Sequence, residues 1–378
     1  MTQRIRVGVL FGGRSGEHEV SLASAESILR YIDQSKYEIV PIGITREGRW
    51  LASGDPLAAL KSGQPLESLA PGAESDAVMP AALLPDPVHG GLVTWTEGAD
   101  SSQLRDLASV DVVFPVLHGT YGEDGTIQGL LEIAGLPYVG AGVLGSSLGM
   151  DKGKMKWQFR AHHLPVADFL EIRRSRFERE PEALLEEIEA SLGLPAFVKP
   201  ARLGSSVGVS KAHTQTELRT ALELAAEFDD RLIAEQSINA RELECSVLGN
   251  EDPQASVVGE IIPAREFYDY EAKYLDEGSR LVIPAAIDES VSEEIRALAI
   301  RAFEAVDCAG MARVDFFLER DTNRVLVNEI NTIPGFTNIS MYPKLWEASG
   351  LSYGDLLDRL IQLAIERYRE KSRNRVNR

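Results

Sequence analysis

The feature that most constrains the fold is a strand, a glycine turn and a helix at the start of the chain. Residues 5–11 are apolar and are predicted to form a buried strand; two glycines follow, and then a helix over residues 19–32. Residues 38–44 form a second expected strand, and residues 110–117 a third that runs into another glycine-rich loop. Strands that alternate with helices pair in parallel, and sites lie at their carboxyl ends. The sequence therefore predicts an α/β domain with a parallel, Rossmann-like sheet over residues 1–140.

The chain of 378 residues is long enough for further domains. Residues 53–103 are rich in Gly, Pro, Ala and Ser, and we expect them to form a peripheral insertion in the first domain, without chemistry of its own. After residue 150 the pattern changes to a compact unit of helices and short strands. We assign residues 141–235 to a lid subdomain and residues 236–378 to a C-terminal subdomain.

Charge and composition exclude several classes of function. A formal charge of −19 at pH 7 argues against a nucleic-acid partner, because binding phosphates requires a basic face. No apolar run reaches the length of about 18 residues that a membrane span needs, and the first residues lack the pattern of a signal peptide. We therefore expect a cytoplasmic protein with no membrane partner. In that compartment Cys245 and Cys308 are expected to be buried thiols rather than a disulfide or zinc ligands.

The strongest metal signal is a predicted hairpin near the C-terminus. Arg313 and Asp315 alternate on one strand and Glu329 and Asn331 on the next, and the turn at residues 321–324 should pair the strands antiparallel. Asp315, Glu329 and Asn331 would then form an all-oxygen cluster suited to Mg²⁺. The alternative is a solvated strand face. The apolar residues between them favour a core hairpin, where unpaired carboxylates are costly.

A lysine on a buried strand precedes a loop of glycine and serine. Lys199 lies on the strand at residues 196–200, and residues 204–208 are Gly-Ser-Ser-Val-Gly. The backbone N–H groups and hydroxyls of such a loop can wrap phosphates while the lysine supplies charge. By itself this signal is weak, because an ordinary hairpin turn has the same composition and the P-loop pattern is absent. Lys152 offers a second lysine.

Two more polar loops follow strands of the first domain. Glu17 and Glu19 crowd the start of the first helix, which disfavours a phosphate there and suits an ammonium ligand. His118 opens the loop at residues 118–125, although a structural histidine is the simpler interpretation. No Ser/His/Asp or Cys/His nucleophile set is found. Together, the lysines, the glycine loop, the oxygen cluster and the acidic loop indicate ATP-driven bond formation on a small amine.

Six motifs, in this order, resemble the D-alanine–D-alanine ligase family of ATP-grasp enzymes. They span residues 12–341 and are Gly-Gly-Arg-Ser-Gly-Glu-His-Glu-Val-Ser-Leu, His-Gly-x-x-Gly-Glu-Asp-Gly, Val-Lys-Pro with Gly-Ser-Ser-Val-Gly, Tyr-Asp-Tyr-Glu-Ala-Lys-Tyr, Arg-Val-Asp, and Asn-Glu-Ile-Asn-Thr-Ile-Pro-Gly-Phe. The resemblance implies an ATP-grasp fold, in which two α+β subdomains follow the parallel-sheet domain and clamp ATP. It also implies ligation of two D-alanines to D-alanyl-D-alanine through D-alanyl phosphate. That product would serve peptidoglycan precursor synthesis, and so cell wall biogenesis and cell shape.

The resemblance implies the nucleotide and metal ligands as well. Two Mg²⁺ ions, or Mn²⁺ in their place, would be held by Asp315, Glu329 and Asn331. Lys152 and Lys199 would bind the phosphates of ATP, and Ser205, Ser206 and Val207 would form the loop that closes over the triphosphate. The adenine-binding hinge would consist of Glu235, Gln236 and Ile238. The carboxylate of Glu242 would bind the ribose. Some family members have lysine in place of Gln236.

The remaining roles implied by the resemblance concern the two amino acids. Glu19 would take the ammonium of the first D-alanine, with His118 at the same subsite. Arg313 and the Gly335 N–H would stabilise the tetrahedral oxyanion. Ser340 and Met341 would form the carboxylate subsite of the second D-alanine, and Lys273 would be a further substrate-binding residue. Tyr274, in a mobile loop, would hydrogen-bond Ser205 and Glu19 and shut the site. The resemblance further implies a homodimer.

Three alternatives remain open. The same chemistry could make D-alanyl-D-lactate or D-alanyl-D-serine, although Lys273 and Tyr274 favour the D-alanine dipeptide because enzymes of the lactate type replace this loop. Another ATP-grasp enzyme, such as a carboxylase, would need a biotin or bicarbonate site, which the sequence does not indicate. A non-catalytic nucleotide-binding module would be expected to lose metal ligands, and Asp315, Glu329 and Asn331 are all present.

Overall fold

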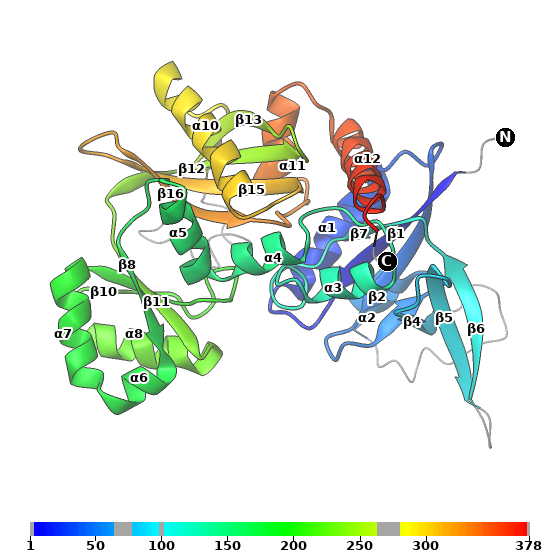
Figure 1. The fold of residues 1–378 in the computed structure, drawn as a ribbon, viewed down its shortest axis with the longest axis horizontal. Coiled ribbons are helices and arrows are strands. Elements are labelled where there is room, and N and C mark those ends of the chain that lie inside the picture. Colours follow the sequence, from blue (N-terminus) through cyan, green and yellow to red (C-terminus); the bar gives the residue numbers. More distant parts are fainter. Residues whose placement is uncertain (1–3, 64–77, 98–101, 263–279, 376–378) are drawn as a thin grey trace.

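The computed structural model describes residues 4–63, 78–97, 102–262 and 280–375. These residues form three sheets, of seven, four and five strands, each with its own helices (Figure 1). The expected α/β architecture, with a parallel-containing sheet followed by two α+β units, is confirmed. No helix of the described part is long and apolar enough to cross a membrane.

The first sheet has the strand order β6-β5-β4-β3-β2-β1-β7. Its parallel part is formed by β1, β2 and β7, as the sequence predicts. The expected insertion is built into this sheet, because β3, β4, β5 and β6 extend it as antiparallel strands. The elements are β1 (Ile5–Gly12), α1 (His18–Tyr31), β2 (Tyr37–Ile44), β3 (Trp50–Ala52), α2 (Pro56–Ser62), β4 (Met79–Leu83), β5 (Gly91–Glu97), β6 (Ser102–Ser109), β7 (Val112–Pro115), α3 (Thr126–Ile133) and α4 (Val143–Met150).

The second sheet, with the order β10-β9-β11-β8, falls in the part of the chain that we expect to form the lid. Its strands are antiparallel, and its helices pack leucines and alanines against one face to form a separate core. The helix α5 (Lys152–Ala161) precedes this unit and links it to the first domain (Figure 1). The lid elements are β8 (Phe169–Arg173), α6 (Arg174–Arg179), α7 (Pro181–Leu192), β9 (Ala196–Pro200), β10 (Ser210–Ala212), α8 (Gln215–Phe228) and β11 (Arg231–Gln236).

The third sheet has the order β14-β13-β12-β15-β16 and is antiparallel throughout. Helices α5 and α10 pack on it, and the core between them includes Cys245 and Cys308 as buried, free thiols. The elements are β12 (Ala240–Gly249), β13 (Gln254–Ile262), β14 (Arg280–Val282), α10 (Glu289–Ala305), β15 (Gly310–Glu319), β16 (Val325–Asn331), α11 (Met341–Ala348) and α12 (Tyr353–Lys371).

Helix α12 packs against the first domain although the chain reaches it last. Its buried leucines share one core with apolar residues of β1, α1 and β7. At the edge of this core the Tyr37 hydroxyl donates to Asp358 (2.7 Å) and accepts from Gln362 (3.0 Å). Figure 1 shows α12 beside α1 and β7. Helix α12 and the first domain therefore form one body, and the lid projects from it (Figure 1).

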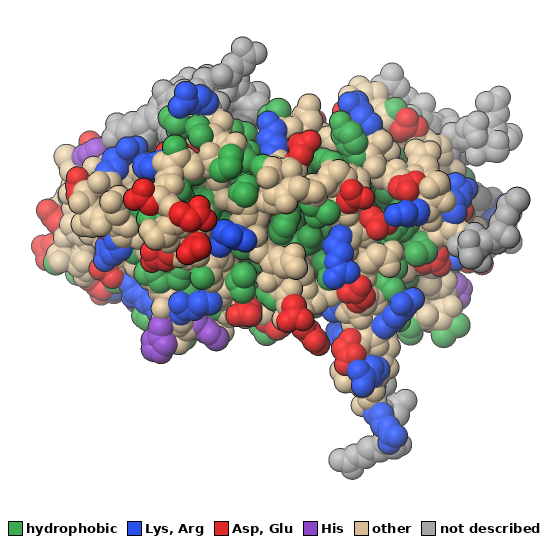
Figure 2. Space-filling model, turned by 90° about the horizontal axis from the view of Figure 1, so that it is seen from above, with side chains coloured by type: hydrophobic (Ala, Val, Ile, Leu, Met, Phe, Trp, Pro, Cys, Tyr) green, Lys and Arg blue, Asp and Glu red, His purple; other side chains and the backbone are tan. Residues whose placement is uncertain are grey.

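The charges of the surface are mixed in sign. Figure 2 shows acidic and basic side chains interspersed over the face that it presents, without a single broad basic patch.

Candidate active site

The predicted hairpin of residues 310–331 is present. Strands β15 and β16 pair antiparallel, with Arg313 opposite Asn331 and Asp315 opposite Glu329. On the other side of β15, Glu244 of β12 lies opposite Asp315. Directly paired residues share a face of a sheet. The register therefore aligns three carboxylates in a row across three strands, of which sequence reasoning had found two.

Arg313 neutralises much of this acidic row. Its guanidinium contacts both oxygens of Asp315 (Nε to Oδ1 2.7 Å, Nη2 to Oδ2 2.8 Å) and also Glu244 (Nε to Oε2 3.1 Å). Burial by itself lowers the pKa of Arg313, but the neighbouring carboxylates, Asp315 first, raise it well above its ordinary value. Asn331 adds a hydrogen bond from its Nδ2 to Asp315 Oδ2 (3.0 Å). The arginine thus stays charged at the centre of the row.

The donor set fits a hard divalent cation. Asp315 and Glu329 supply carboxylate oxygens side by side, and Asn331 supplies an amide oxygen. In the described part of the chain, no group of three or more His, Cys, Asp or Glu residues could enclose a metal by itself. A cation here would need ligands from water or substrate as well, which is the coordination that Mg²⁺ prefers.

Two predicted phosphate lysines lie beside this row. Lys152, at the start of α5, has its Nζ 3.8 Å from Glu329 Oε2 and donates to the Leu203 carbonyl (2.7 Å). Lys199, on β9, pairs with Glu235 Oε2 at 2.5 Å. The Leu203 carbonyl lies directly before the glycine–serine loop, so one lysine joins this loop to the carboxylates.

The glycine–serine loop reaches across to the first domain. Ser205 and Ser206 have positive φ values of 49° and 57°, a left-handed backbone that turns the loop sharply. The Ser205 hydroxyl donates to Glu17 Oε1. A side chain at Gly204 would place its Cβ 2.6 Å from Glu17 Oε2, so the Glu17 carboxylate would have to move to admit one. Val207 closes the turn with its N–H on the Gly204 carbonyl (3.2 Å).

The structure separates Glu19 from this cluster, contrary to its predicted place. The Glu19 side chain is 64% exposed and pairs with Arg46 Nη2 at 2.6 Å. Glu17, only 9% exposed, is the carboxylate that contacts the loop. Helix α1 begins at His18, and residues two apart on a helix point to nearly opposite sides because each residue turns the helix by about 100°. The Glu19 side chain therefore points away from the loop, and Glu17 is the carboxylate of this pair that contacts it.

His118 is buried and held in one orientation. Its Nδ1 faces the Ile333 carbonyl (3.0 Å), and its Nε2 faces the Ser24 hydroxyl (3.1 Å), which fits a neutral ring protonated on Nδ1. Burial lowers the pKa of His118, although Glu17 opposes that shift. The histidine thus connects the first domain to the turn after β16.

A second residue, missed by sequence reasoning, makes the same connection. Glu123 accepts hydrogen bonds from the Gly119 N–H (2.8 Å) and the Ile333 N–H (3.0 Å). Burial, and then the charge of Glu17, raise the pKa of Glu123 to about 8. Its signal in the sequence was its place in the glycine loop that follows β7.

Gly335 and Ser340, predicted for the oxyanion and the second substrate, lie in the turn between β16 and α11, and Met341 begins α11. A Cβ on Gly335 would be 2.8 Å from Ser340 Oγ, so the backbone and this hydroxyl are in close contact. The Ser340 hydroxyl accepts from the Thr337 N–H (3.1 Å). Met341 has a buried side chain that packs with Ile261 and Leu345. Only its backbone is available to a substrate.

The predicted adenine hinge lies at the end of β11 and in the turn to β12. Glu235 is buried, Gln236 is exposed and Ile238 is half-buried, and the Gln236 N–H donates to the Asp168 carbonyl (2.9 Å). Glu242 is half-buried on β12, opposite Phe317. The hinge residues thus lie where the chain passes from the lid sheet to the third sheet. Lys273 and Tyr274 lie outside the described residues.

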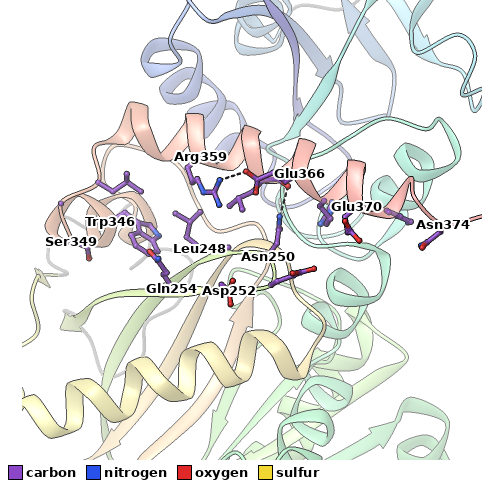
Figure 3. Close-up of a pocket in the computed structure, with 17 residues that line it drawn as sticks. Leu248, Asn250, Asp252, Gln254, Trp346, Ser349, Arg359, Glu366, Glu370 and Asn374 are labelled. Carbon is purple, nitrogen blue, oxygen red and sulfur yellow. Dashed lines mark hydrogen bonds and ion pairs between the residues drawn. The ribbon is translucent and has the colours of Figure 1, made fainter.

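A cavity of about 1020 Å³ lies elsewhere, between α12 and the turn from β12 to β13 (Figure 3). It includes none of the predicted site residues. Some of its polar groups are engaged locally: Arg359 pairs with Glu366 (2.8 Å), and Asn250 Nδ2 donates to the Leu363 carbonyl (3.0 Å). We assign this cavity no part in the chemistry of the carboxylate row.

Comparison with known proteins covers almost the whole chain. A family model described as the D-ala D-ala ligase N-terminus matches residues 6–141, and one described as the D-ala D-ala ligase C-terminus matches residues 158–362. The D-alanine–D-alanine ligase of Natranaerobius thermophilus is 50% identical over 372 residues, 98% of each chain. That of Thermoanaerobacter sp. (strain X514) is 50% identical over 98% of this chain and 99% of its own.

Two solved structures are similar throughout. The D-alanine-D-alanine ligase of Coxiella burnetii superposes with a TM-score of 0.79 at 41% identity, covering 98% of this chain and 97% of its own. The VanG D-Ala:D-Ser ligase of Enterococcus faecalis has a TM-score of 0.83 at 37% identity, covering 96% of this chain and 100% of its own.

Proposed function

The chain belongs to the D-alanine–D-alanine ligase family, and on this premise we propose that it uses ATP to join two D-alanines into D-alanyl-D-alanine. The observation that carries the proposal is the hydrogen bond from Ser205 to Glu17. It brings a phosphate-type loop of the lid against a buried carboxylate of the first domain, with Lys152 behind the loop. A triphosphate and a small ammonium compound could therefore meet at one place.

Nucleotide binding would use the lysines and the carboxylate row. Lys152 and Lys199 would supply positive charge to the phosphates, and the backbone of residues 204–208 would supply N–H donors. Asp315, Glu329 and Asn331 would hold two Mg²⁺ ions, and Mn²⁺ could replace them. When bound, the metal would neutralise charge on the phosphates.

The first D-alanine would bind through its ammonium to Glu17, in place of Glu19. Its carboxylate oxygen would attack the γ-phosphorus, form D-alanyl phosphate and release ADP. The amine of the second D-alanine would then attack the acyl carbon, so that a C–N bond forms, the C–O bond to phosphate breaks and inorganic phosphate leaves. The amine gives up its proton in that step.

The residues around the acyl carbon suit the second step. Arg313 and the Gly335 N–H would stabilise the oxyanion, and such donors are worth about 3–4 kcal/mol each in other acyl-transfer enzymes. Ser340 and the Met341 backbone would bind the carboxylate of the second D-alanine. Lys273 and Tyr274 would complete this subsite and its closure, a role that rests on the family resemblance. The neutral His118 would orient the first D-alanine.

The test is a product assay with the purified protein, ATP and MgCl₂. D-Alanine alone, and D-alanine mixed with D-serine or with D-lactate, would be supplied, and phosphate and ligated products would be quantified together. We expect phosphate release that depends on D-alanine, with one phosphate per D-alanyl-D-alanine. D-Serine is included because a similar solved structure is a D-Ala:D-Ser ligase. A mixed product in excess over D-alanyl-D-alanine, or phosphate release independent of D-alanine, would contradict the proposal.

We extend the proposal to the setting of the reaction. The protein would act in the cytoplasm as a homodimer, and its dipeptide would enter peptidoglycan precursors. Sedimentation of the purified chain would measure the oligomeric state, and a monomer at working concentrations would remove that part of the proposal.

A further inference from the structure

Lys156 is a buried lysine to which neither the sequence motifs nor the proposed reaction gives a role. It lies on α5, four residues after Lys152 and therefore on the same side of the helix. Only 1% of its surface is exposed. Its Nζ is 2.8 Å from Glu235 Oε1 and donates to the Asn328 carbonyl at 3.0 Å. An ammonium group is rarely buried so fully unless it is paired.

The carboxylate of Glu235 therefore lies between two ammonium groups. Lys156 contacts one oxygen, and Lys199 contacts the other at 2.5 Å. Burial alone would raise the pKa of Glu235, but the two lysines, Lys156 first, lower it to about 2. Glu235 is thus a permanent anion with two counter-ions.

The two lysines differ in how firmly they are held. Lys199 is on strand β9 of the lid, next to the glycine–serine loop. Lys156 is fixed by a second bond to Asn328, and Asn328 is the extra residue where the pairing of β15 with β16 shifts register. The extra residue of a β-bulge is left out of the ladder, so its carbonyl is available to Lys156.

ATP would compete with this arrangement, an argument that rests on the proposed function. A phosphate would draw Lys199 away from Glu235, because the two anions would share one positive charge. Were it the only counter-ion, its movement to the phosphates would leave a carboxylate buried and unpaired, which is strongly unfavourable. With Lys156 in place, Glu235 keeps one cation throughout.

We propose that Lys156 is a positioning residue for nucleotide binding: it is the fixed counter-ion of Glu235 and so frees Lys199 for the phosphates of ATP. It also ties the last lid strand to β16, the strand that bears the metal ligands Glu329 and Asn331. Nucleotide affinity then depends on a side chain that the nucleotide never touches.

The test is Lys156→Met, which keeps the length of the side chain and removes the charge. We expect the Kd for ADP with MgCl₂, measured by calorimetry without D-alanine, to rise about tenfold to a hundredfold, the usual effect of losing an outer supporting group. The KM for ATP should rise in parallel, and the KM for D-alanine should change by less than about twofold. The matched control is Lys154→Met on the same helix, because Lys154 is 44% exposed and pairs with Glu171 at the surface. It should bind ADP like the unmodified chain.

A second pair of variants decides the case if Lys156→Met does not fold. Glu235→Gln removes the anion, so adding Lys156→Met to it should change the Kd for ADP by less than about threefold if Lys156 acts through Glu235. The proposal would be overturned if Lys156→Met weakened ADP binding a further tenfold in the Glu235→Gln variant. It would also be overturned if the single variant Lys156→Met bound ADP as tightly as the unmodified chain. Both measurements use ADP alone. They remain decisive even if the unmodified chain fails to release phosphate with D-alanine, which would count only against the proposed function.

Discussion

At the scale of single residues, Glu17 and Glu19 form a matched pair. Both are carboxylates at the start of α1, but only Glu17 faces the loop, whereas Glu19 pairs with Arg46 at the surface. We expect Glu17→Gln to lower kcat/KM for D-alanine at least thirtyfold, corresponding to about 2 kcal/mol for the loss of a buried ionic partner. Glu19→Gln should stay within about twofold. D-Alanine-dependent phosphate release measures both, and the reverse order would restore Glu19 to the site.

Glu244 leads to a second prediction at this scale. A cation on Asp315 would compete with Arg313 for the same oxygens, and Glu244 is the other carboxylate that contacts the guanidinium. We expect Glu244→Gln to lower kcat about tenfold, as supporting partners commonly do, with little change in the KM for ATP. The control is Glu251→Gln in the exposed turn between β12 and β13. A variant whose kcat is unchanged would show that Asp315 alone orients the arginine.

Residue positions were predictable from sequence where strand alternation determines them. Asp315, Glu329 and Asn331 share a face because neighbours two apart on a strand do so wherever the strand begins. The direction of Glu17 and Glu19 depends instead on the residue at which a helix starts, and α1 starts at His18, one residue before the predicted Glu19. Glu244 was not predictable from the sequence, because only the pairing of β12 with β15 brings it beside Asp315.

At the scale of elements, helix α12 stabilises a domain far from it in sequence. Leu360 is fully buried in the core shared with β1 and α1. Leu360→Ala should lower the free energy of unfolding by about 2–5 kcal/mol. Hydrogen exchange should show the loss of protection in β1 and α1 as well as in α12. Arg359→Ala, next to it but exposed and paired with Glu366, should change stability by no more than about 0.5 kcal/mol. Faster exchange confined to α12 would contradict the shared core.

The ion pair between Glu235 of β11 and Lys156 of α5 makes the free energy of unfolding depend on pH. The pKa of Glu235 falls from an ordinary 4.5 to about 2, despite burial, because of Lys156 and Lys199. A depressed pKa contributes stability that is present above pH 4.5 and is lost as the pH falls toward 2. The free energy of unfolding, measured by urea titration at several pH values, should therefore decline less steeply below pH 4.5 in Glu235→Gln. Parallel curves would exclude this contribution.

The order and type of most elements followed from local pattern, but their partners did not. The strands at residues 5–11, 38–44 and 110–117 were predictable because buried parallel strands are continuous apolar runs. The packing of α12 against the first domain was not, because an amphipathic helix shows which face is buried and leaves open which core receives it. The same limit applies to β4, β5 and β6, whose sequence suggested a peripheral insertion and which extend the first sheet.

At the scale of the whole molecule, the glycine–serine loop of the lid contacts the first domain. The hydrogen bond from Ser205 to Glu17 joins the lid loop to the first domain, and Lys152 holds the same loop through the Leu203 carbonyl. Closure would exclude water from D-alanyl phosphate, which otherwise hydrolyses instead of reacting with the second amine. Loosening this contact should therefore uncouple the two steps.

The last prediction concerns that coupling. Ser205→Ala removes the hydroxyl and leaves the charges of the site in place, so we expect the loop to open more often. Turnover should fall about tenfold, which is the loss of one charge-assisted hydrogen bond of about 1.4 kcal/mol. More tellingly, the phosphate released per dipeptide formed should rise above one, because water intercepts the acyl phosphate. Both products are quantified in the same reaction, and Ser372→Ala, at the exposed end of α12, is the control. If Ser205→Ala keeps the one-to-one ratio however slow its turnover, then closure does not depend on this contact.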